Sequence, residues 1–202
     1  MRVINRFTAP ALLALALMFT ATTVAAGHHR APPTMLERLA ATDGAQALVA
    51  AVLVVDDAEA LDFSLADLLA DRHAEIILFA PGNGAFEKLL GLEAGSLDGL
   101  DVETIAGALP GILGGLGLDA EAVAAVLLKH ASLPRRANRA FASENALLRR
   151  GEVEVADGSV LPVGIGDNGV SVNREADIVK ANVFVRNGVI HFIDAVIVDD
   201  LL

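Results

Sequence analysis

Between residues 35 and 130, most apolar side chains follow the spacing of α-helices. Apolar residues occupy nearly every position of Ala45–Val55, which predicts a helix that is buried on all sides. A second stripe has the spacing i, i+3, i+4 and i+7 and consists of Val123, Val126, Leu127 and His130. The second pattern predicts a helix over 120–130, with Asp119 as its N-cap.

Two further helices are indicated by residues that cap helix N-termini. Thr34 and Glu37 have the spacing of a capping box, in which each side chain accepts a hydrogen bond from the other residue's backbone. This pair predicts a helix that starts at Met35. Ser64 is the expected N-cap of a short helix over 65–70.

One apolar run interrupts the helical pattern. Ile76–Ala80 is continuous and of strand length, which is typical of a strand covered on both faces. Pro81 cannot donate to a sheet ladder, so the strand is expected to end there. Asn83 is expected to cap the next helix, which runs to about Leu90.

The segment 91–117 is rich in glycine and leucine and includes the sequence GALPGILGGLGL. Glycine and proline both disfavour helix interiors. We therefore expect one short helix over Val102–Leu109, with loops on either side.

From Gly151 onward, short apolar runs alternate with turn residues, which predicts strands. Asn187-Gly188 predicts a type I′ turn between the last two strands, 183–185 and 189–198, because both residues adopt positive φ easily. Helices thus precede antiparallel strands, and the early strand near Phe79 must cross over to join them. This order predicts an α+β domain, a small twisted β-sandwich with helices packed on one side.

The N-terminus has the layout of a secretory signal peptide. Arg2 and Arg6 precede a short apolar core, and Val24-Ala25-Ala26 forms a small-residue cleavage site. The core is too short to span a bilayer, and the alternative is an uncleaved anchor. We expect a secreted protein, periplasmic or extracellular, that consists of a signal peptide over 1–26, a flexible tether over 27–34 and one domain over 35–202.

Charge narrows the classes of partner. The chain has 15 basic and 26 acidic residues, and loss of the leader's two arginines lowers the formal charge from −11 to −13. Such an acidic surface repels phosphate backbones and anionic lipids. We therefore expect no nucleic-acid binding and no stable membrane insertion after signal cleavage. Cysteine is absent from the sequence, so stability must come from packing rather than disulfides.

Six basic residues nevertheless cluster between residues 129 and 150. They form either a solvated loop or a contact patch, and charged runs are more often solvated. The six are Lys129, Arg135, Arg136, Arg139, Arg149 and Arg150.

Two segments together resemble the fasciclin domain family. Ile77-Leu78-Phe79-Ala80-Pro81, followed by Ala85-Phe86, is similar to the first signature box of the family. The sequence NGVIHFID over 187–194 matches the second box closely, and the resemblance extends from about Leu36 to the C-terminus. It implies a fasciclin-like wedge whose fold-specifying residues are Phe79, Ala80, Pro81, Asn187, Gly188, His191 and Asp194.

The resemblance also implies a non-catalytic role in cell adhesion, extracellular matrix or cell-surface association. In animal members, a Tyr-His segment and an Asp-Ile pair before the second box are implicated in integrin contact. Here Lys129-His130 and Asn182-Val183 stand at these positions, so Lys129 departs from the tyrosine, and Asn182-Val183 departs from the Asp-Ile pair. We expect these four residues to contact a partner, a surface or matrix protein or a polysaccharide, rather than an integrin.

Candidate catalytic and cofactor motifs are weak. Gly164, Gly166 and Gly169 spell GxGxxG, but a strand pattern follows where a dinucleotide site needs a helix, so we interpret them as turn residues. His191 and Asp194 are three apart on a predicted strand and therefore leave opposite faces. We expect neither a cofactor nor a metal site, and we interpret His130 as a core histidine with a contact or pH-sensing role as the alternative.

Three functions compete. The first is an extracellular binding module for adhesion. The second is a carrier for a small apolar ligand, which the Gly/Leu-rich segment 108–118 would bind, although that segment also suits a core. The third is a hydrolase, for which no nucleophile and base can be assembled from the motifs.

Overall fold

The computed structural model describes residues 31–134 and 142–198, which belong to one compact unit. The predicted signal peptide, residues 27–30 of the tether, and Arg135, Arg136 and Arg139 lie outside the described residues. The helices are α2 (Met35–Ala40), α3 (Gln46–Asp57), α4 (Leu65–Ala70), α5 (Asn83–Leu90), α6 (Val102–Gly115), α7 (Ala120–Lys129) and α9 (Glu144–Arg150). The strands are β1 (Ile76–Pro81), β2 (Ala131–Ser132), β3 (Glu152–Glu154), β4 (Val160–Gly166), β5 (Gly169–Val172), β6 (Ala176–Val185) and β7 (Gly188–Ile193).

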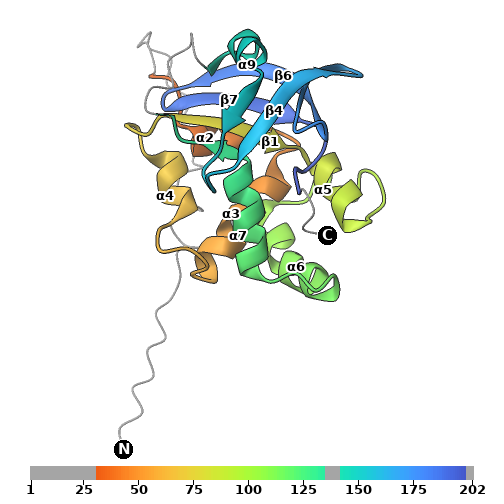
Figure 1. The fold of residues 1–202 in the computed structure, drawn as a ribbon. Helices are drawn as coiled ribbons and strands as arrows, with labels where there is room; N and C mark the ends of the chain where they lie inside the picture. The colour runs from red at the N-terminus through yellow and green to blue at the C-terminus, as the bar shows by residue number, and fades with distance from the viewer. Residues whose placement is uncertain (1–30, 135–141, 199–202) are drawn as a thin grey trace, which may run out of the picture. The chain divides into compact units, whose positions relative to one another are not determined.

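The strands form one seven-stranded sheet in the order β2-β1-β7-β6-β5-β4-β3. β1 pairs in parallel with β7 over its whole length, and the other neighbours are antiparallel. The predicted α+β class is confirmed, as is the crossover of the early strand to join the later ones. The sheet curls into a nearly barrel-like form instead of two separate sheets (Figure 1).

Two hydrophobic cores lie on opposite faces of β1 and β7. Alternate residues of a strand point to opposite faces, and Ile76 and Leu78 therefore join a helical core, defined by the buried residues of α2 to α7. Ile77 and Phe79 join a sheet core with buried residues of β3 to β7 and Leu147 of α9. All six residues of β1 are buried, which confirms the strand predicted to be covered on both faces.

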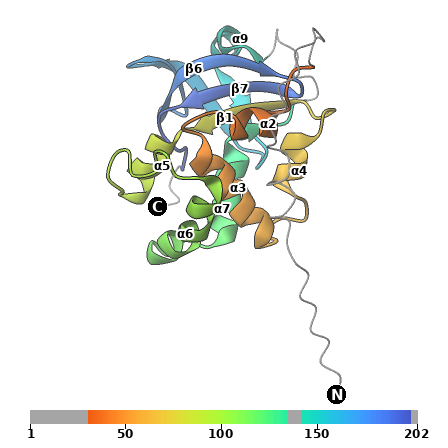
Figure 2. The same cartoon turned by 180° about the vertical axis from the view of Figure 1, so that it is seen from behind.

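The helices divide between the two cores. Figures 1 and 2 show α3, α6 and α7 on one side of the sheet and α9 on the other. Most helices therefore pack on one side, as expected, but α9 covers the opposite, concave side and closes the sheet core.

Three predicted N-caps are confirmed. Thr34 and Glu37 form the complete capping box of α2, with Thr34 N to Glu37 Oε2 at 2.8 Å and Glu37 N to Thr34 Oγ1 at 3.3 Å. Ser64 and Asp119 accept hydrogen bonds at the starts of α4 and α7. Thr34 is buried, so the last residue of the predicted tether packs with the domain.

The expected role of Asn83 is wrong. α5 begins after Gly82 and has no side-chain cap. The Asn83 Oδ1 accepts a hydrogen bond at 3.0 Å from Ala47 N, at the start of α3, and α3 has no cap of its own in sequence. Asn83 thus caps a helix that lies 36 residues earlier in the chain.

The helix predicted over 102–109 extends to Gly115 and continues through Pro110. Its buried stripe is Ile105, Leu109 and Leu113, at the i, i+4, i+8 spacing, and these side chains pack in the helical core. Packing of this stripe outweighs the low helix propensity of the glycines and proline. The loop expected after Leu109 is therefore replaced by helix.

The β6–β7 hairpin forms where expected, but its turn is not type I′. Val185 pairs with Gly188, so the two turn residues are Arg186 and Asn187, and neither has positive φ. β7 also ends at Ile193 rather than reaching residue 198. Positive φ at consecutive residues occurs instead in the β5–β6 turn, at Asn173 (58°) and Arg174 (61°).

Candidate functional site

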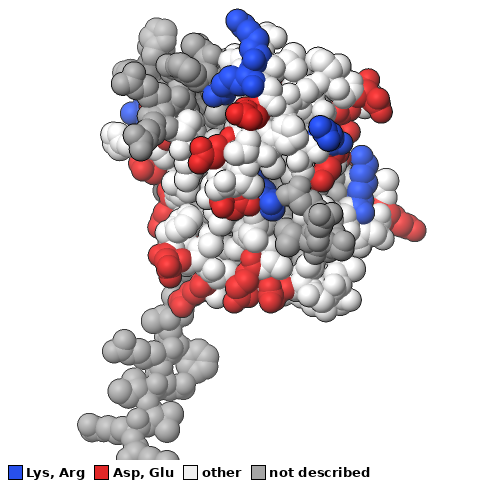
Figure 3. Space-filling view, in the orientation of Figure 1, with Lys and Arg blue, Asp and Glu red and all other residues white. Residues whose placement is uncertain are grey.

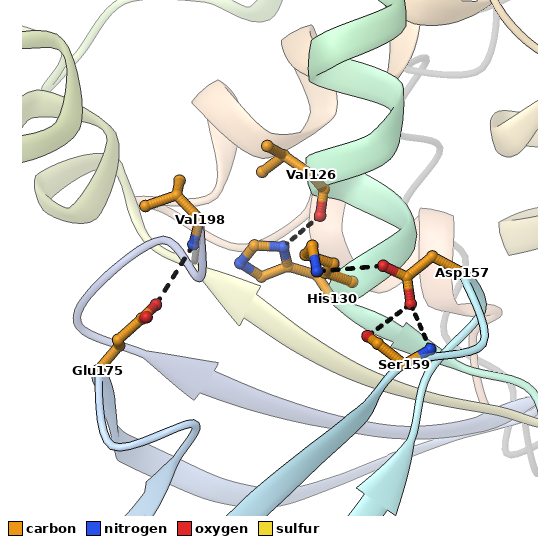
Figure 4. Close-up of polar contacts among 7 residues, drawn as sticks. Val126, His130, Asp157, Ser159, Glu175 and Val198 are labelled. Carbon is orange, nitrogen blue, oxygen red and sulfur yellow. Dashed lines mark hydrogen bonds and ion pairs between the residues drawn. The ribbon is translucent and has the colours of Figure 1, made fainter. Parts of the chain in front are cut away.

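The C-terminal end of α7 is held by His130, which is 1% exposed. Its Nδ1 lies 2.7 Å from the Val126 carbonyl oxygen, and its Nε2 lies 3.0 Å from the backbone nitrogen of Ile197. Nδ1–H therefore donates to Val126, and Nε2 accepts from Ile197, which fits one neutral tautomer. Figure 4 shows the ring between α7 and the chain that follows β7.

Burial lowers the pKa of His130 to about 4, because a charged imidazole loses its hydration there. The hydrogen bond to Val126 favours the charged form but does not outweigh this loss. The ring is therefore neutral at physiological pH. Both ring nitrogens of His130 bond to backbone groups inside the fold, which confirms its interpretation as a core histidine. The side chain is therefore not exposed for the predicted contact with a partner.

Lys129, the neighbour of His130, lies near the surface. Its Nζ is 3.3 Å from Asp157 Oδ2, and Asp157 Oδ1 accepts hydrogen bonds from the backbone and hydroxyl of Ser159 (Figure 4). Partial burial raises the pKa of Asp157, but the hydrogen bonds from Ser159 and the Lys129 ammonium outweigh it, so the pKa is lowered overall. The β3–β4 turn is thereby tied to the end of α7.

Asn182 lies in an irregular part of β6, where the register with β7 shifts. It has a φ of 60°, which is uncommon for a residue other than glycine. Its Oδ1 accepts from Glu144 N at 2.9 Å at the start of α9, and its backbone N–H donates to His191 Nδ1 at 3.4 Å. Asn182 therefore fastens α9 to the sheet.

His191 completes this attachment from β7. It is fully buried, its Nε2 lies 2.9 Å from the Ala142 carbonyl oxygen, and its ring stacks on Phe79 at 5.8 Å between centroids. Burial lowers its pKa, and the bond to Ala142 opposes that shift. Phe79 and His191 are also register partners in the β1–β7 ladder, so the two sequence boxes lie side by side.

The four predicted contact residues form two separate groups. Lys129 and His130 immediately precede β2, whereas Asn182 and Val183 lie on β6, and β1 and β7 separate these strands in the sheet. Val183 is half-buried against the helical core and pairs with Ile190. The structure therefore does not assemble the four into one cluster.

Asn187 and Gly188 have structural roles that explain the Asn-Gly pair. The Asn187 side chain accepts from Met35 N at 2.8 Å and donates to the carbonyls of Leu69 and Asp71, which joins α2 and the end of α4 to the hairpin. Gly188 has a φ of 148°, and an added Cβ would clash with the backbone of Ile76. Only glycine allows this close approach of β7 to β1.

Pro81 and Asp194 lie at the far ends of the paired strands. Pro81 is the last residue of β1 and pairs with Ile193 of β7, and Ala80 precedes it in the ladder. Asp194 follows β7, is half-exposed, and accepts a hydrogen bond at 2.8 Å from Asp177 N through its Oδ1. It therefore supports the start of β6.

Sequence reasoning missed three polar residues with roles of this kind. Glu87 is buried, and its two carboxylate oxygens accept from Gly95 N and Leu97 N at 2.8 Å each. Asp56 accepts from the backbone of Leu65 and Ala66 and so caps α4 beside Ser64. The third is Asn83. Their partners lie 8 to 37 residues away, so no local motif marks them.

Within residues 31–134 and 142–198, no group of three His, Asp or Glu side chains is placed to hold a metal ion. In the same residues, every buried side-chain nitrogen or oxygen has a hydrogen-bond partner. No single described helix is long and apolar enough to cross a membrane. Taken together, α6 and α7 would be long and apolar enough, but they are bent by 106° with respect to each other.

Comparison with known proteins identifies a family from the sequence and a similar fold among solved structures. The profile described as "Fasciclin domain" matches residues 56–199. A solved structure, the FAS1 domain pair from the insect cell adhesion molecule Fasciclin I, superposes with a TM-score of 0.58 at 11% identity and covers 84% of this chain. The match covers 52% of that structure's chain, so this protein spans about half its length. No curated protein sequence matches significantly.

Proposed function

Because the chain belongs to the fasciclin domain family, we propose that it is an exported binding module that attaches a cell surface or matrix to a partner. The family match over residues 56–199 carries this proposal. Fasciclin domains serve adhesion as binding modules, and the partner proposed for this chain is a surface or matrix protein or a polysaccharide.

The use of polar groups inside the fold supports a non-catalytic role. His130, His191, Asn83 and Asn187 are buried and direct their side chains at backbone groups. A general acid or base has to reach a substrate and titrate near the working pH. Both histidines instead have lowered pKa values and no free ring nitrogen.

Export is proposed from the leader pattern over 1–26, and residues 27–33 are proposed as a tether between the cleavage site and the domain, since Thr34 packs with the domain. The acidic surface suits an exported module that must stay soluble. On the face shown in Figure 3, acidic side chains are spread widely and basic ones are sparser. Partners with neutral or basic surfaces fit such a face better than anionic ones.

Among the predicted contact residues, Lys129, Asn182 and Val183 are the half-exposed ones. We propose Lys129 and Val183 as separate contact points. The His130 ring is buried, so we propose only that it holds the end of α7 in place and thereby positions Lys129.

Cell attachment tests the proposed function. Deleting the gene should reduce attachment of cells to surfaces or to one another, and the full chain should restore it. A version without residues 2–26 should fail to restore it, because it is not exported. Unchanged attachment in the deletion strain would reject the adhesion role.

A pull-down tests the proposed contact points. The domain fused to beads should retain a component of its own cell-surface fraction, and Lys129→Ala or Val183→Ser should weaken retention several-fold. Val179→Ser is the matched control for Val183→Ser, because Val179 is exposed on the same strand. Equal retention by all four proteins would exclude these contact points but leave the adhesion role standing.

A further inference from the structure

A small apolar cavity lies between α3, α5, α6, α7 and the chain after β7. Its volume is about 60 Å³. The wall includes Phe86 of α5, Leu113 of α6, Val123 and Val126 of α7, and Val196. All of the residues that line it are apolar, so water gains no hydrogen-bond partner from a side chain there.

The exposure of the wall shows where the cavity opens. Leu113 and Val123 are buried, whereas Leu89, Leu118, Ala122 and Val198 are half-exposed. The cavity therefore extends from the helical core towards the surface between α5, the start of α7 and the last described residue of the chain.

The size of the cavity limits its occupant. A cavity of about 150 Å³ holds one benzene molecule, and this one has less than half that volume. It has room for about two or three carbon atoms of an aliphatic chain, and the rest of the ligand has to lie outside. Each methylene that moves from water into such a site raises affinity about fourfold.

The charges beside the opening select against an anionic ligand. The Asp119 Oδ1 accepts a hydrogen bond at 2.9 Å from the backbone nitrogen of the wall residue Ala122. Glu175 accepts a hydrogen bond from the backbone of Val198 at 3.3 Å (Figure 4). Lys88 precedes the wall residue Leu89, and its Nζ donates a hydrogen bond to the Asp194 carbonyl oxygen at 3.2 Å.

We propose that this cavity binds the end of an uncharged aliphatic chain, such as that of a long-chain alcohol or another neutral lipid. The carboxylates of Asp119 and Glu175, each bonded to the backbone of a wall residue, repel the headgroup of a fatty acid, and the apolar wall accepts only the hydrocarbon part. Neither of the proposed contact points, Lys129 and Val183, lines the cavity. An adhesion module with this site would also hold or carry a neutral lipid.

Titration with 1-decanol and decanoate tests the proposal, because the two probes share a chain length and differ in charge. The full exported chain is titrated below the concentration at which either probe aggregates, and the methyl resonances of Leu113, Val123 and Val126 are followed. We expect saturable shifts with 1-decanol and at least tenfold weaker binding of decanoate at neutral pH.

Two matched variants locate the site. Ala122→Phe places a ring in the wall and should weaken 1-decanol binding at least tenfold. Ala125→Phe adds the same ring to the same helix at a half-exposed position outside the wall and should change it less than twofold. Ala122→Leu replaces the first variant if thermal unfolding shows that it does not fold.

Four results would overturn the proposal. Absence of saturable shifts, or equal weakening by the two phenylalanine variants, would overturn the site. Decanoate binding as tight as that of 1-decanol would overturn the uncharged class. A chain that ends at Val198 and binds 1-decanol at least tenfold more tightly would show that Asp199–Leu202 occupies the cavity, and would overturn the ligand proposal.

Discussion

Single buried polar residues join segments of this chain that are far apart in sequence. Asn187 bonds to Met35 across 152 residues, and His130 bonds to Ile197 across 67. A buried polar side chain is stable only when its hydrogen bonds are satisfied, and loss of one partner leaves the other unsatisfied. These residues therefore stabilise one arrangement of helices around the sheet.

The lowered pKa of His130 predicts a pH-dependent stability. The pKa is about 4 in the folded chain and 6.5 in the unfolded one, so the unfolded chain takes up the proton first as pH falls. Stability should be full above about pH 6.5 and should decrease by about 3 kcal/mol as pH falls to about 4. Urea unfolding at several pH values measures this decrease.

His191 contributes in the same direction, because its pKa is also lowered. His130→Gln should therefore reduce the pH dependence without removing it. His73→Gln is the control for the loss of an imidazole, since His73 is exposed, and the pH dependence of His130→Gln is compared with it. If the free energy of unfolding changed with pH equally in His130→Gln and in wild type, the pH dependence could not be attributed to His130.

Gly188→Ala tests the close approach of β7 to β1. The added methyl group meets the backbone of Ile76, and a φ of 148° strains any residue with a Cβ. We expect a loss of about 2 kcal/mol or more in the free energy of unfolding. Gly107→Ala in α6 has open space and should instead stabilise by about 0.5–1 kcal/mol. Equal effects of the two changes would show that β7 can move away from β1.

At the scale of elements, several helices are capped from outside their own sequence. Asn83 caps α3, Asn182 caps α9, and Asp56 adds to the cap of α4. A cap satisfies backbone N–H groups that the helix itself leaves without partners. Caps that come from another element make each of these helices depend on the tertiary fold.

Asn83→Ala should therefore destabilise the whole domain. It removes the cap of α3 and the Asn83 hydrogen bonds to Gln46 and to the Leu97 carbonyl. We expect a loss of about 2–3 kcal/mol, measured by denaturant unfolding. Asn145→Ala on the exposed side of α9 should change stability by less than about 0.5 kcal/mol. A loss no larger than that of Asn145→Ala would show that α3 does not need this cap.

Pro110→Ala tests whether α6 forms against its own propensity. Pro110 cannot donate the hydrogen bond of a helix interior, and its position is exposed. Alanine restores this donor, so we expect a gain of about 1–3 kcal/mol and a higher melting temperature. A melting temperature equal to or below that of wild type would mean that α6 is shaped around the proline.

At the scale of the molecule, the parallel pair of β1 and β7 lies between the helical core and the sheet core. Opening of this pair exposes both cores, whereas β3 is at the edge of the sheet. We expect the slowest amide hydrogen exchange in β1 and β7 and faster exchange in β3, measured by NMR or mass spectrometry. Equal protection of β3 and β1 would contradict this order.

The sequence predicted those features that depend on near neighbours. The sequence predicted the caps at Thr34, Ser64 and Asp119 because each cap bonds to a residue three positions along the chain. It predicted the buried β1 because the apolar run is continuous, has the length of a strand and ends at a proline. The crossover of the strand near Phe79 to join the later strands was expected from the order of the elements. The predicted type I′ turn at Asn187-Gly188 was wrong. The asparagine is there for its side-chain hydrogen bonds, and the glycine for its close contact with Ile76, and neither role can be told from turn geometry in the sequence.

By itself, the sequence therefore determined most of the helical and strand segments, the α+β class and the family, but it gave no sign of α9 or β2. Only the tertiary structure decided the longer α6, the long-range role of Asn83, the hydrogen bond between His130 and Ile197, and the apolar cavity. The reason is physical. Local hydrogen bonds and the periodicity of apolar residues depend on residues a few positions apart. Packing and long-range hydrogen bonds depend on which distant segments meet, and no local pattern encodes that.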